Sequence, residues 1–574
     1  MKSICNPINI RYLYQHIKEM EKVSINREAA DISIRLFKGK YYLFASMIKG
    51  FYHSEDLVKW EYRETPELPV YGYAPDICII DDYVYVCASS REKCAFYRTK
   101  DPLNGSFEEI PTDLVFWDPN LFQDDDGRVY LYWGCSDRDP IWGIELDRNT
   151  MKPAGEKAVL ISGNPESYGW ERCAENNDLK LQVKHPYFTG GPFIEGPWMT
   201  KNNNTYYLQY AAPGTEYNVY SDGVYTSKNP MGPFSYAKHN PVSSKPGGFI
   251  TGAGHGSTFE DKYGNWWHAS TMRISVNHPF ERRVGLFPAE FDKDGIFCVN
   301  QNFADYPMPV PERKINIWEE AIPLRMLLSY KKKAEASSSA PGFTPENAVN
   351  EDIRTYWVAG DNIPGENICV DLGDVYPVNA IQLNLGDHKL SPEKYSEDKW
   401  VELIAGYSKR IIDSDFAAAE FTIEISEDKS DWQLIKDSRG SSEDHTHEYI
   451  PFDVPVNARY IRVTGYKMPY NAPFTVSGIR VFGVGKGSAP AKVKIIQAER
   501  TGPMNAYLKW TSDRAIGYNI RYGIGKEKLY SSWLLYERTE LDLGTLTKGQ
   551  KYYMCIDAFN ENGITEGDII EVEE

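Results

Sequence analysis

Residues 117–134, WDPNLFQDDDGRVYLYWG, contain the pattern that decides the fold. A carboxylate beside a proline is followed by a short apolar run, a polar turn and an aromatic strand that ends in a small residue. The turn is rich in Asp and Gly, residues that tolerate the positive φ angles of tight β-hairpins. The stretch therefore predicts a β-hairpin with a polar residue at the start of its first strand.

The same pattern occurs five times in the first half of the chain. The polar residues that start the copies are separated by 45, 42, 77 and 60 residues, and they are Asp31, Asp76, Asp118, Glu195 and His255. Each hairpin needs neighbours to cover its buried face, and five such units arranged radially form a five-bladed β-propeller. We expect the five polar residues to meet at one mouth of the central channel. An ordinary β-sandwich explains the alternating strands but not the polar start of every repeat.

Charge and hydropathy exclude several classes of partner. The chain has 63 basic and 81 acidic residues, a net charge of -18 and a pI near 5.2, so it repels nucleic acids and anionic membranes. It has no run of about 18 apolar residues, so we expect no membrane-spanning helix. The first residues have no apolar signal-peptide core. We therefore expect either a cytoplasmic protein or, if a signal peptide was removed, an extracytoplasmic (periplasmic or secreted) one, and the oligomeric state stays open.

The aromatic and cysteine contents are also informative. Aromatic residues make up 14% of the chain, which suits both β-strands and surfaces that stack on sugars. The nine cysteines are scattered without a CxxC pair, so the sequence predicts neither a zinc site nor a dense disulfide framework. We expect Cys78, Cys87 and Cys135 to be buried as small apolar residues.

Several carboxylates at one mouth have a specific chemical use. Hydrolysis of a glycosidic bond needs one carboxylic acid and one carboxylate that acts as base or nucleophile. Like charges crowded around one pocket raise the pKa of at least one member, which creates a proton donor near neutral pH.

Five motifs identify a family at this point. ADISI, WDPNLFQDDDGRVYLYWG, IEGPWM, GHGS and ERRVGLFP occur in order and together resemble glycoside hydrolase family 43 over about residues 25–310. The resemblance implies hydrolysis with inversion, in which water is the nucleophile. It makes Asp31 the general base, Glu195 the general acid and Asp118 the third carboxylate, which orients the acid and adjusts its pKa. One departure is that many members have proline after the base, where this chain has Ile32.

The same resemblance assigns residues around the carboxylates. It implies that Arg282 contacts sugar hydroxyls, while Arg283 points to the other face of the strand. It places His255 below the pocket, near waters or a calcium or sodium ion, although a hydrogen-bonding role without metal is an equal alternative. No other cofactor is required.

Further residues are candidates for the sugar site. We expect Asp76 to belong to the ring of polar residues, and Tyr73, Trp117 and Trp198 either to stack on sugar or to pack between blades. A polar and aromatic insertion, residues 162–191, precedes Glu195, and we expect its Trp170 and His185 at the rim of the pocket.

Two further β-rich segments follow the propeller. Residues 322–486, with PENAVNEDIRTYWVAG, IRVTG and IRVFG, resemble the discoidin (factor 5/8 type C) domain, a jelly-roll β-sandwich that commonly binds a glycan or a surface. Residues 490–574 resemble a fibronectin type III domain, with Trp510 as core indole and Tyr552 as corner tyrosine. The predicted class is all-β: a five-bladed propeller over 1–310, a jelly-roll sandwich over 322–486 and an immunoglobulin-like sandwich over 490–574.

These features predict an inverting exo-glycoside hydrolase. It would release a terminal α-L-arabinofuranose or β-D-xylose from a plant-type polysaccharide or oligosaccharide. The alternatives are a β-D-galactosidase or exo-galactanase with the same machinery, a non-catalytic carbohydrate-binding propeller, and a phosphate-dependent enzyme. The sequence leaves open whether the two C-terminal domains bind glycan or brace the propeller.

Overall fold

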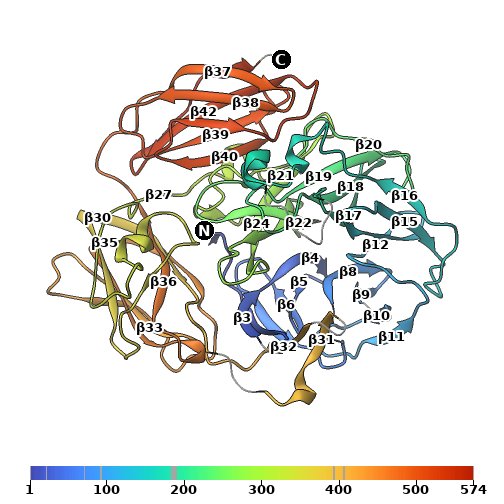
Figure 1. Cartoon of the computed structure of the whole chain (residues 1–574), viewed down its shortest axis with the longest axis horizontal. Helices are drawn as coiled ribbons and strands as arrows, with labels where there is room; N and C mark the ends of the chain where they lie inside the picture. Colours follow the sequence, from blue (N-terminus) through green and yellow to red (C-terminus); the bar gives the residue numbers. More distant parts are fainter. Residues whose placement is uncertain are drawn as a thin grey trace.

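The computed structural model of the chain describes residues 2–572, except 21, 70–71, 91–93, 183–189, 392–394 and 405–407. It is almost entirely β-structure, and the described residues contain one short α-helix, α1 (Ile317–Glu320). In Figure 1 a propeller lies beside a sandwich that contains β30 and β36, and a second sandwich with β37–β42 lies above both. None of the helices in the described part of the chain has the length and hydropathy needed to cross a membrane.

The propeller has five blades of consecutive antiparallel strands, as its repeats predict. The first blade comprises β4 (Ala30–Phe37), β5 (Lys40–Ser46), β6 (Gly50–Ser54) and β7 (Glu61–Glu64). The second comprises β8 (Tyr73–Ile80), β9 (Tyr83–Ser89), β10 (Ala95–Thr99) and β11 (Glu108–Pro111). The third comprises β12 (Asn120–Gln123), β13 (Val129–Trp133), β15 (Ile141–Leu146) and β16 (Ala158–Ile161).

The last two blades complete the ring. The fourth comprises β17 (Ile194–Asn202), β18 (Thr205–Ala212), β19 (Ser221–Ser227) and the short strands β20 (Ser235–Tyr236) and β21 (Ser243–Ser244). The fifth comprises β22 (Thr251–Glu260), β23 (Trp266–Arg273), β24 (Arg282–Phe291) and β25 (Phe297–Val299). The hairpin turns form where the sequence places them; between β12 and β13, for example, Gly127 takes a φ of 84° that few other residues tolerate.

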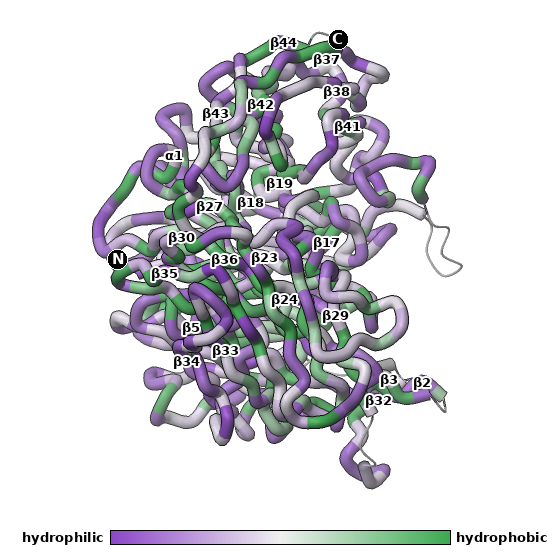
Figure 2. The backbone as a smooth tube through the Cα atoms, turned by 90° about the vertical axis from the view of Figure 1, so that its left-hand side faces the viewer, coloured by the Kyte–Doolittle hydropathy of each residue, from purple (hydrophilic) through white to green (hydrophobic). Residues whose placement is uncertain are grey.

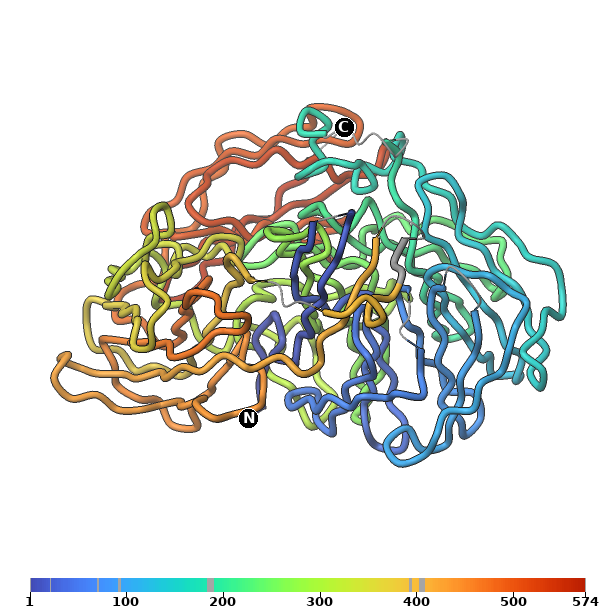
Figure 3. The backbone as a smooth tube through the Cα atoms, turned by 60° about the horizontal axis from the view of Figure 1, so that its bottom comes forward, coloured from blue at the N-terminus to red at the C-terminus, as the bar shows by residue number. Residues whose placement is uncertain are grey.

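An N-terminal hairpin extends the fifth blade into the next domain. It consists of β2 (Leu13–Glu19) and β3 (Lys22–Glu28), and β3 pairs with β24 through Glu28 and Arg282. On its other side, β2 pairs with β32 (Ser408–Asp413), which pairs with β31 (Val401–Ile404). Figure 2 shows β2, β3 and β32 together at the lower right, and Figure 3 shows the dark blue hairpin beside the orange segment that contains β32. One sheet therefore runs from the propeller into the 322–486 region.

The two C-terminal regions are β-sandwiches with their own cores. The first contains β27 (Met326–Leu327), β28 (Lys333–Ala336), β29 (Trp357–Val358), β30 (Asn367–Leu385), β33 (Glu420–Ser426), β34 (Gln433–Asp437), β35 (His447–Lys467) and β36 (Thr475–Gly483). The second has a sheet of β37 (Lys494–Gly502), β38 (Asn505–Thr511) and β41 (Glu540–Leu543). Its other sheet has β39 (Gly517–Gly523), β40 (Ser531–Tyr536), β42 (Tyr552–Asn560), β43 (Gly563–Thr565) and β44 (Ile570–Val572). Trp510 is fully buried in this core, and the Tyr552 hydroxyl accepts a hydrogen bond from Thr547 N at 3.0 Å.

All three parts share one buried cluster. It joins Phe303 and Tyr306 of the propeller, Phe482 of the first sandwich and Phe559 of the second. Beside it, the buried guanidinium of Arg480 donates to Asp305 O at 2.6 Å and pairs with Glu351. The sandwiches therefore pack on the propeller through apolar contacts and a buried hydrogen bond, as a domain core does.

Candidate active site

The start of each innermost strand has the same local geometry. In four blades the pairing register shifts there, at Ala30/Ser33, Tyr73/Asp76, Glu195/Trp198 and Gly254/Ser257. One residue in each blade adopts a left-handed backbone at this point: Asp31 (φ 52°), Ala74 (48°), Asp118 (51°), Gly196 (57°) and His255 (48°). Such bulges turn a side chain out of the regular sheet alternation. Here they direct one residue of each blade to the axis.

This geometry corrects the register of the predicted repeat in two blades. In the second blade the residue with the left-handed backbone is Ala74. Asp76 comes two residues later, at the position that Ser33 and Asn120 occupy in the first and third blades. In the fourth blade it is Gly196, because a Cβ there would lie 2.6 Å from the His255 ring. Glu195 therefore reaches the axis from the preceding position.

Asp31, Asp118, Glu195 and His255 lie together at the axis. His255 Nδ1 is 3.3 Å from Asp31 Oδ1 and 3.7 Å from Asp118 Oδ2. One oxygen of Asp118, one of Glu195 and the Cys135 sulfur all lie within 4.8 Å of one another. The arrangement brings three carboxylates and one imidazole into a single cluster, in which Asp31 and Asp118 are buried.

Asp31 is held as a carboxylate. Arg282 donates to both of its oxygens, at 2.9 and 3.0 Å, and Ser46 Oγ donates to Oδ2 at 2.6 Å. Its backbone N–H donates to Thr271 Oγ1 of the fifth blade at 2.8 Å. Burial alone would raise the pKa of Asp31, but the charges of Arg282 and His255 and these hydrogen bonds hold it below its ordinary value. Asp31 can therefore accept a proton.

Asp118 has the opposite environment. Its backbone N–H donates to Ser89 Oγ at 2.8 Å, which fixes the start of the third blade against the second. Burial raises the pKa of Asp118 to about 7; the charge of His255 opposes this shift, and the charges of Glu195 and Asp31 add to it. The cluster thus retains a proton on a carboxyl near neutral pH.

Glu195 has a donor at each oxygen. The Tyr220 hydroxyl lies 2.6 Å from Oε1, and the Cys135 sulfur lies 3.1 Å from Oε2. Cys135 belongs to β14 (Cys135–Ser136), which pairs directly with β17 at Glu195. These contacts fix the direction of the carboxyl group.

The environment of His255 is relevant to the calcium or sodium ion that the family resemblance implies. Burial disfavours the imidazolium, but the charges of Asp31 and Asp118 outweigh burial and raise the pKa of His255. His255 Nδ1 faces two carboxylates, at 3.3 and 3.7 Å, so this nitrogen already has partners within the cluster. Binding of calcium or sodium through water stays a prediction.

Arg282 has two carboxylate partners. Besides Asp31, its Nε donates to Glu28 Oε1 at 2.6 Å, and both Arg282 and Glu28 are buried. Arg283 points the other way and donates to His447 Nε2 of the first sandwich at 2.9 Å. The contact of Arg282 with a sugar hydroxyl stays a prediction, whereas its contact with Asp31 is direct.

Asp76 and Trp170 do not lie where the sequence predicts them, whereas Trp198 takes the second of its two predicted roles and packs between blades. Asp76 is buried between blades, where it accepts from Leu121 N at 2.7 Å and from the Asn120 side chain at 3.1 Å. Trp198 is 3% exposed and donates to Thr258 O at 3.0 Å. Both occupy the second position after the bulge, which faces the neighbouring blade. Trp170 is 1% exposed in the core of the fourth blade, and His185 lies outside the described residues.

Tyr73 and Trp117 form part of an aromatic rim. Their ring centroids are 6.2 Å apart, and Tyr73 is 5.8 Å from Phe280. Phe280 lies 5.1 Å from the Arg282 guanidinium, and all three rings are half-buried. Half-buried aromatic faces beside carboxylates are suited to packing against a sugar ring.

Four residues at this site were not predicted from the sequence: Glu28, Cys135, Tyr220 and Phe280. Cys135 is half-buried and contacts Glu195, so the expectation of a small buried apolar residue is wrong for it. The register of the repeats could have been predicted from the sequence. Aligning the repeats on Pro75, Pro119 and Pro197 puts Ala74, Asp118 and Gly196 at one position. The sequence has no such pattern for Glu28, because Glu28 reaches Arg282 through the pairing of β3 with β24.

Two segments of the chain match known family models. Residues 20–297 match the family model "Glycosyl hydrolases family 43", and residues 407–478 match the "F5/8 type C domain". A xylan 1,3-beta-xylosidase of Vibrio sp is 26% identical over 286 residues, 43% of this chain and 49% of that protein. A xylosidase/arabinosidase of Humicola insolens is 27% identical over 257 residues, 39% of this chain and 73% of that protein.

A third relative is a non-reducing end alpha-L-arabinofuranosidase of Bacteroides ovatus. It is 25% identical over 295 residues, 46% of this chain and 50% of that protein. The chain spans about half the length of the first and third of these relatives.

Proposed function

We propose that this chain, through its glycosyl hydrolases family 43 domain, is an inverting exo-glycoside hydrolase. Its substrate is a plant-type oligosaccharide or polysaccharide from which it releases a terminal α-L-arabinofuranose or β-D-xylose. Asp31 is the general base, Glu195 the general acid and Asp118 the third carboxylate. The single observation that carries the proposal is the cluster at the propeller axis, in which His255 contacts Asp31 and Asp118, Arg282 contacts Asp31, and Glu195 lies beside Asp118.

The environments of the carboxylates support a division of roles. Asp31, whose pKa is lowered, removes a proton from water as the water oxygen attacks the anomeric carbon. Glu195 gives its proton to the leaving oxygen as the glycosidic bond breaks. The pKa of Asp118, raised to about 7, lets this residue hold a proton beside Glu195 near neutral pH. Two carboxylates with opposed pKa shifts are the usual equipment for acid and base at one pH.

The choice of sugar rests on the relatives. The names of the Vibrio and Humicola proteins refer to xylose or arabinose, and that of the Bacteroides protein to arabinofuranose. We therefore favour these two sugars over galactose. The retained set of three carboxylates favours hydrolysis over a non-catalytic carbohydrate-binding role.

Aryl glycosides test the proposal directly. We expect the full chain to hydrolyse 4-nitrophenyl α-L-arabinofuranoside or 4-nitrophenyl β-D-xylopyranoside in preference to the β-D-galactopyranoside. Glu195→Gln keeps the shape of the side chain but cannot donate an acidic proton, so kcat should fall by about 10²-fold or more. Asp76→Asn is the matched control, because it also removes a buried carboxylate of the propeller, but one that lies between blades and outside the axial cluster. Full activity in Glu195→Gln would contradict the assignment of the acid.

The C-terminal sandwiches have a structural part in this proposal. The second resembles a fibronectin type III domain in its buried Trp510 and its Tyr552 corner. Through Gly169 N, which donates to Leu546 O at 2.9 Å, it supports the insertion that precedes Glu195. We infer that both sandwiches brace the catalytic domain.

A further inference from the structure

A cavity lies beside the carboxylate cluster. It has a volume of about 340 Å³, within the usual range for ligand pockets. Its lining includes both cations and carboxylates: Arg273, Arg354, Glu175, Glu216, Asn277 and His278. Four of these residues come from blades 4 and 5 of the propeller, Glu175 comes from the insertion before Glu195, and Arg354 comes from the first sandwich.

The cavity borders the proposed catalytic residues. Arg273 pairs across the strands with Arg282, the partner of Asp31. Glu216 follows Thr215, whose hydroxyl lies 3.4 Å from Arg282 Nη1. A sugar chain whose terminal unit lies against Asp31 would therefore extend its next unit into this cavity.

Arg273 gives the cavity a buried donor. It is 3% exposed, and its Nη1 donates to Glu175 at 2.6 Å and to Glu216 O. Its Nε has no hydrogen-bond partner among the described residues, although it is buried. A buried guanidinium N–H without a partner is costly and is readily satisfied by an oxygen of a bound molecule.

Contacts between the propeller and the first sandwich fix the position of Arg354. The neighbouring Ile353 is 3% exposed within the propeller core, and its N–H donates to Phe249 O at 3.0 Å. From the other side, Asn277 Nδ2 donates to Asp387 O at 2.9 Å. No acidic side chain pairs with the Arg354 guanidinium in the part of the chain that the structure describes.

The lining selects a class of ligand. The charges of the two guanidinium groups balance those of the two carboxylates. An anion is therefore repelled by Glu175 and Glu216, and a cation is repelled by both arginines. A neutral ring with several hydroxyls can donate to the carboxylates and accept from the arginines and Asn277. His278 adds a largely buried ring, 5.6 Å from Phe280 in the aromatic rim.

We propose that this cavity binds the leaving-group sugar of an oligosaccharide substrate and that Arg354 of the first sandwich is one of its recognition residues. The inference rests on the function proposed above, because it assumes cleavage at the Asp31–Glu195 site. It makes the first sandwich part of the substrate site, in addition to a support for the propeller.

A comparison of disaccharides with aryl glycosides distinguishes recognition of the leaving-group sugar from a general effect on activity. The test compares the full-length protein with Arg354→Ala on xylobiose and 4-nitrophenyl β-D-xylopyranoside, or on the arabinose equivalents if arabinose is the preferred sugar. The loss of a hydrogen bond from a charged group should lower the ratio of kcat/KM for disaccharide to kcat/KM for aryl glycoside by about tenfold, mainly through KM. Asn277→Ala should lower the same ratio, and it covers the case in which Arg354→Ala folds poorly.

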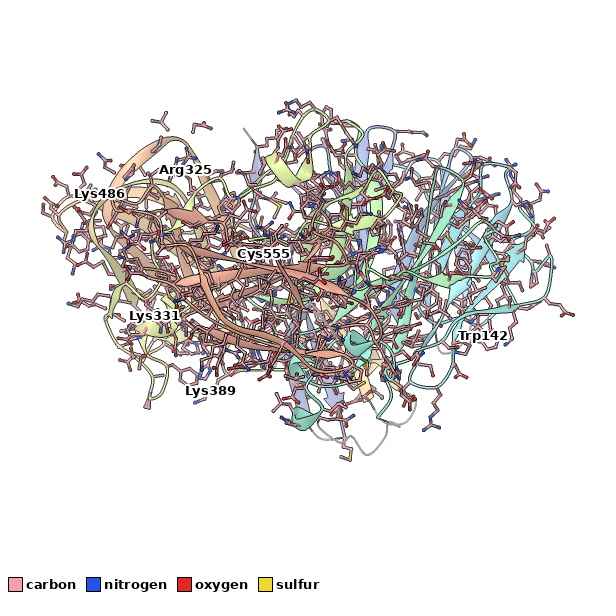
Figure 4. All side chains as sticks on the ribbon, turned by 90° about the horizontal axis from the view of Figure 1, so that it is seen from above. Trp142, Arg325, Lys331, Lys389, Lys486 and Cys555 are labelled. Atoms are coloured by element: carbon pink, nitrogen blue, oxygen red, sulfur yellow. The ribbon has the colours of Figure 1, made fainter. Side chains whose placement is uncertain are left out.

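Arg325→Ala is the matched control. Arg325 is an exposed arginine of the same region, outside the cavity lining, and it is labelled in Figure 4. It should leave the ratio unchanged within about twofold, as most surface substitutions do. An equal loss on both substrates in Arg354→Ala and Asn277→Ala, or no loss on either, would overturn the proposal. A wild-type protein without activity on any of the aryl glycosides would instead contradict the proposed function.

Discussion

Asp31 and Asp118 are the same type of residue with opposite electrostatics. Both are buried and both have a left-handed backbone at the start of a blade. Arg282 contacts Asp31 directly, whereas Asp118 has Glu195 and the Cys135 thiol as neighbours. The position of one arginine therefore contributes to the difference between Asp31, whose pKa is lowered, and Asp118, whose pKa is raised to about 7.

The pH profile of kcat/KM on an aryl glycoside should reflect both groups. Activity requires a proton on the Asp118–Glu195 pair, so it should fall as the pH rises through about 7. It also requires ionised Asp31, whose pKa lies below the ordinary value of 3.8, so activity should persist at pH 5. Thermal melting at each pH shows whether the protein is folded. Full activity up to pH 9, or loss of activity in folded protein at pH 5, would contradict this assignment.

At the scale of elements, the sequence predicts the repeats better than their register. Five hairpins with polar starts identify five blades, because strand alternation and turn residues are local properties. Asp76 was misplaced because the bulge that turns Ala74 toward the axis depends on pairing with the next strand. Glu28 and Phe280 could not be found, because they reach Arg282 and the rim through contacts between elements distant in sequence.

The hairpin of β2 and β3 depends on one buried arginine. Arg27 is 1% exposed; its Nε and Nη2 pair with Asp387 at 2.9 and 2.8 Å, and its Nη1 lies 3.3 Å from Asp444. Arg27→Met would leave two buried carboxylates without their cation, which costs about 3–5 kcal/mol. We expect a clear fall in the midpoint of thermal unfolding.

An exposed ion pair supplies the control for that substitution. Arg459 pairs with Asp371 at 2.8 Å but is 37% exposed, so Arg459→Met should cost less than about 1 kcal/mol. Equal effects of the two substitutions would show that the hairpin is not anchored through Arg27.

At the scale of the whole molecule, the three domains form one folded unit. Removing the chain beyond residue 320 would delete Arg480, Asp387 and Asp444, together with the sandwich side of the shared cluster around Tyr306. The exposed cluster and the unpaired Arg27 favour unfolding or aggregation.

We therefore expect a chain that ends at residue 320 to be poorly soluble and inactive on small aryl glycosides. Soluble yield, circular dichroism and turnover measure this outcome. A folded fragment that keeps its activity on aryl glycosides and loses only binding to polymer would show that the sandwiches act in targeting.

The stereochemistry of the released sugar tests the central claim most directly. If Asp31 activates water opposite the leaving oxygen that Glu195 protonates, the first sugar formed has the inverted anomeric configuration. Proton NMR of the first turnovers on the preferred aryl glycoside should show the α-anomer from β-D-xyloside or the β-anomer from α-L-arabinofuranoside, before mutarotation. Release of the retained anomer would contradict the account, because it requires a covalent intermediate on a carboxylate instead of direct attack by water.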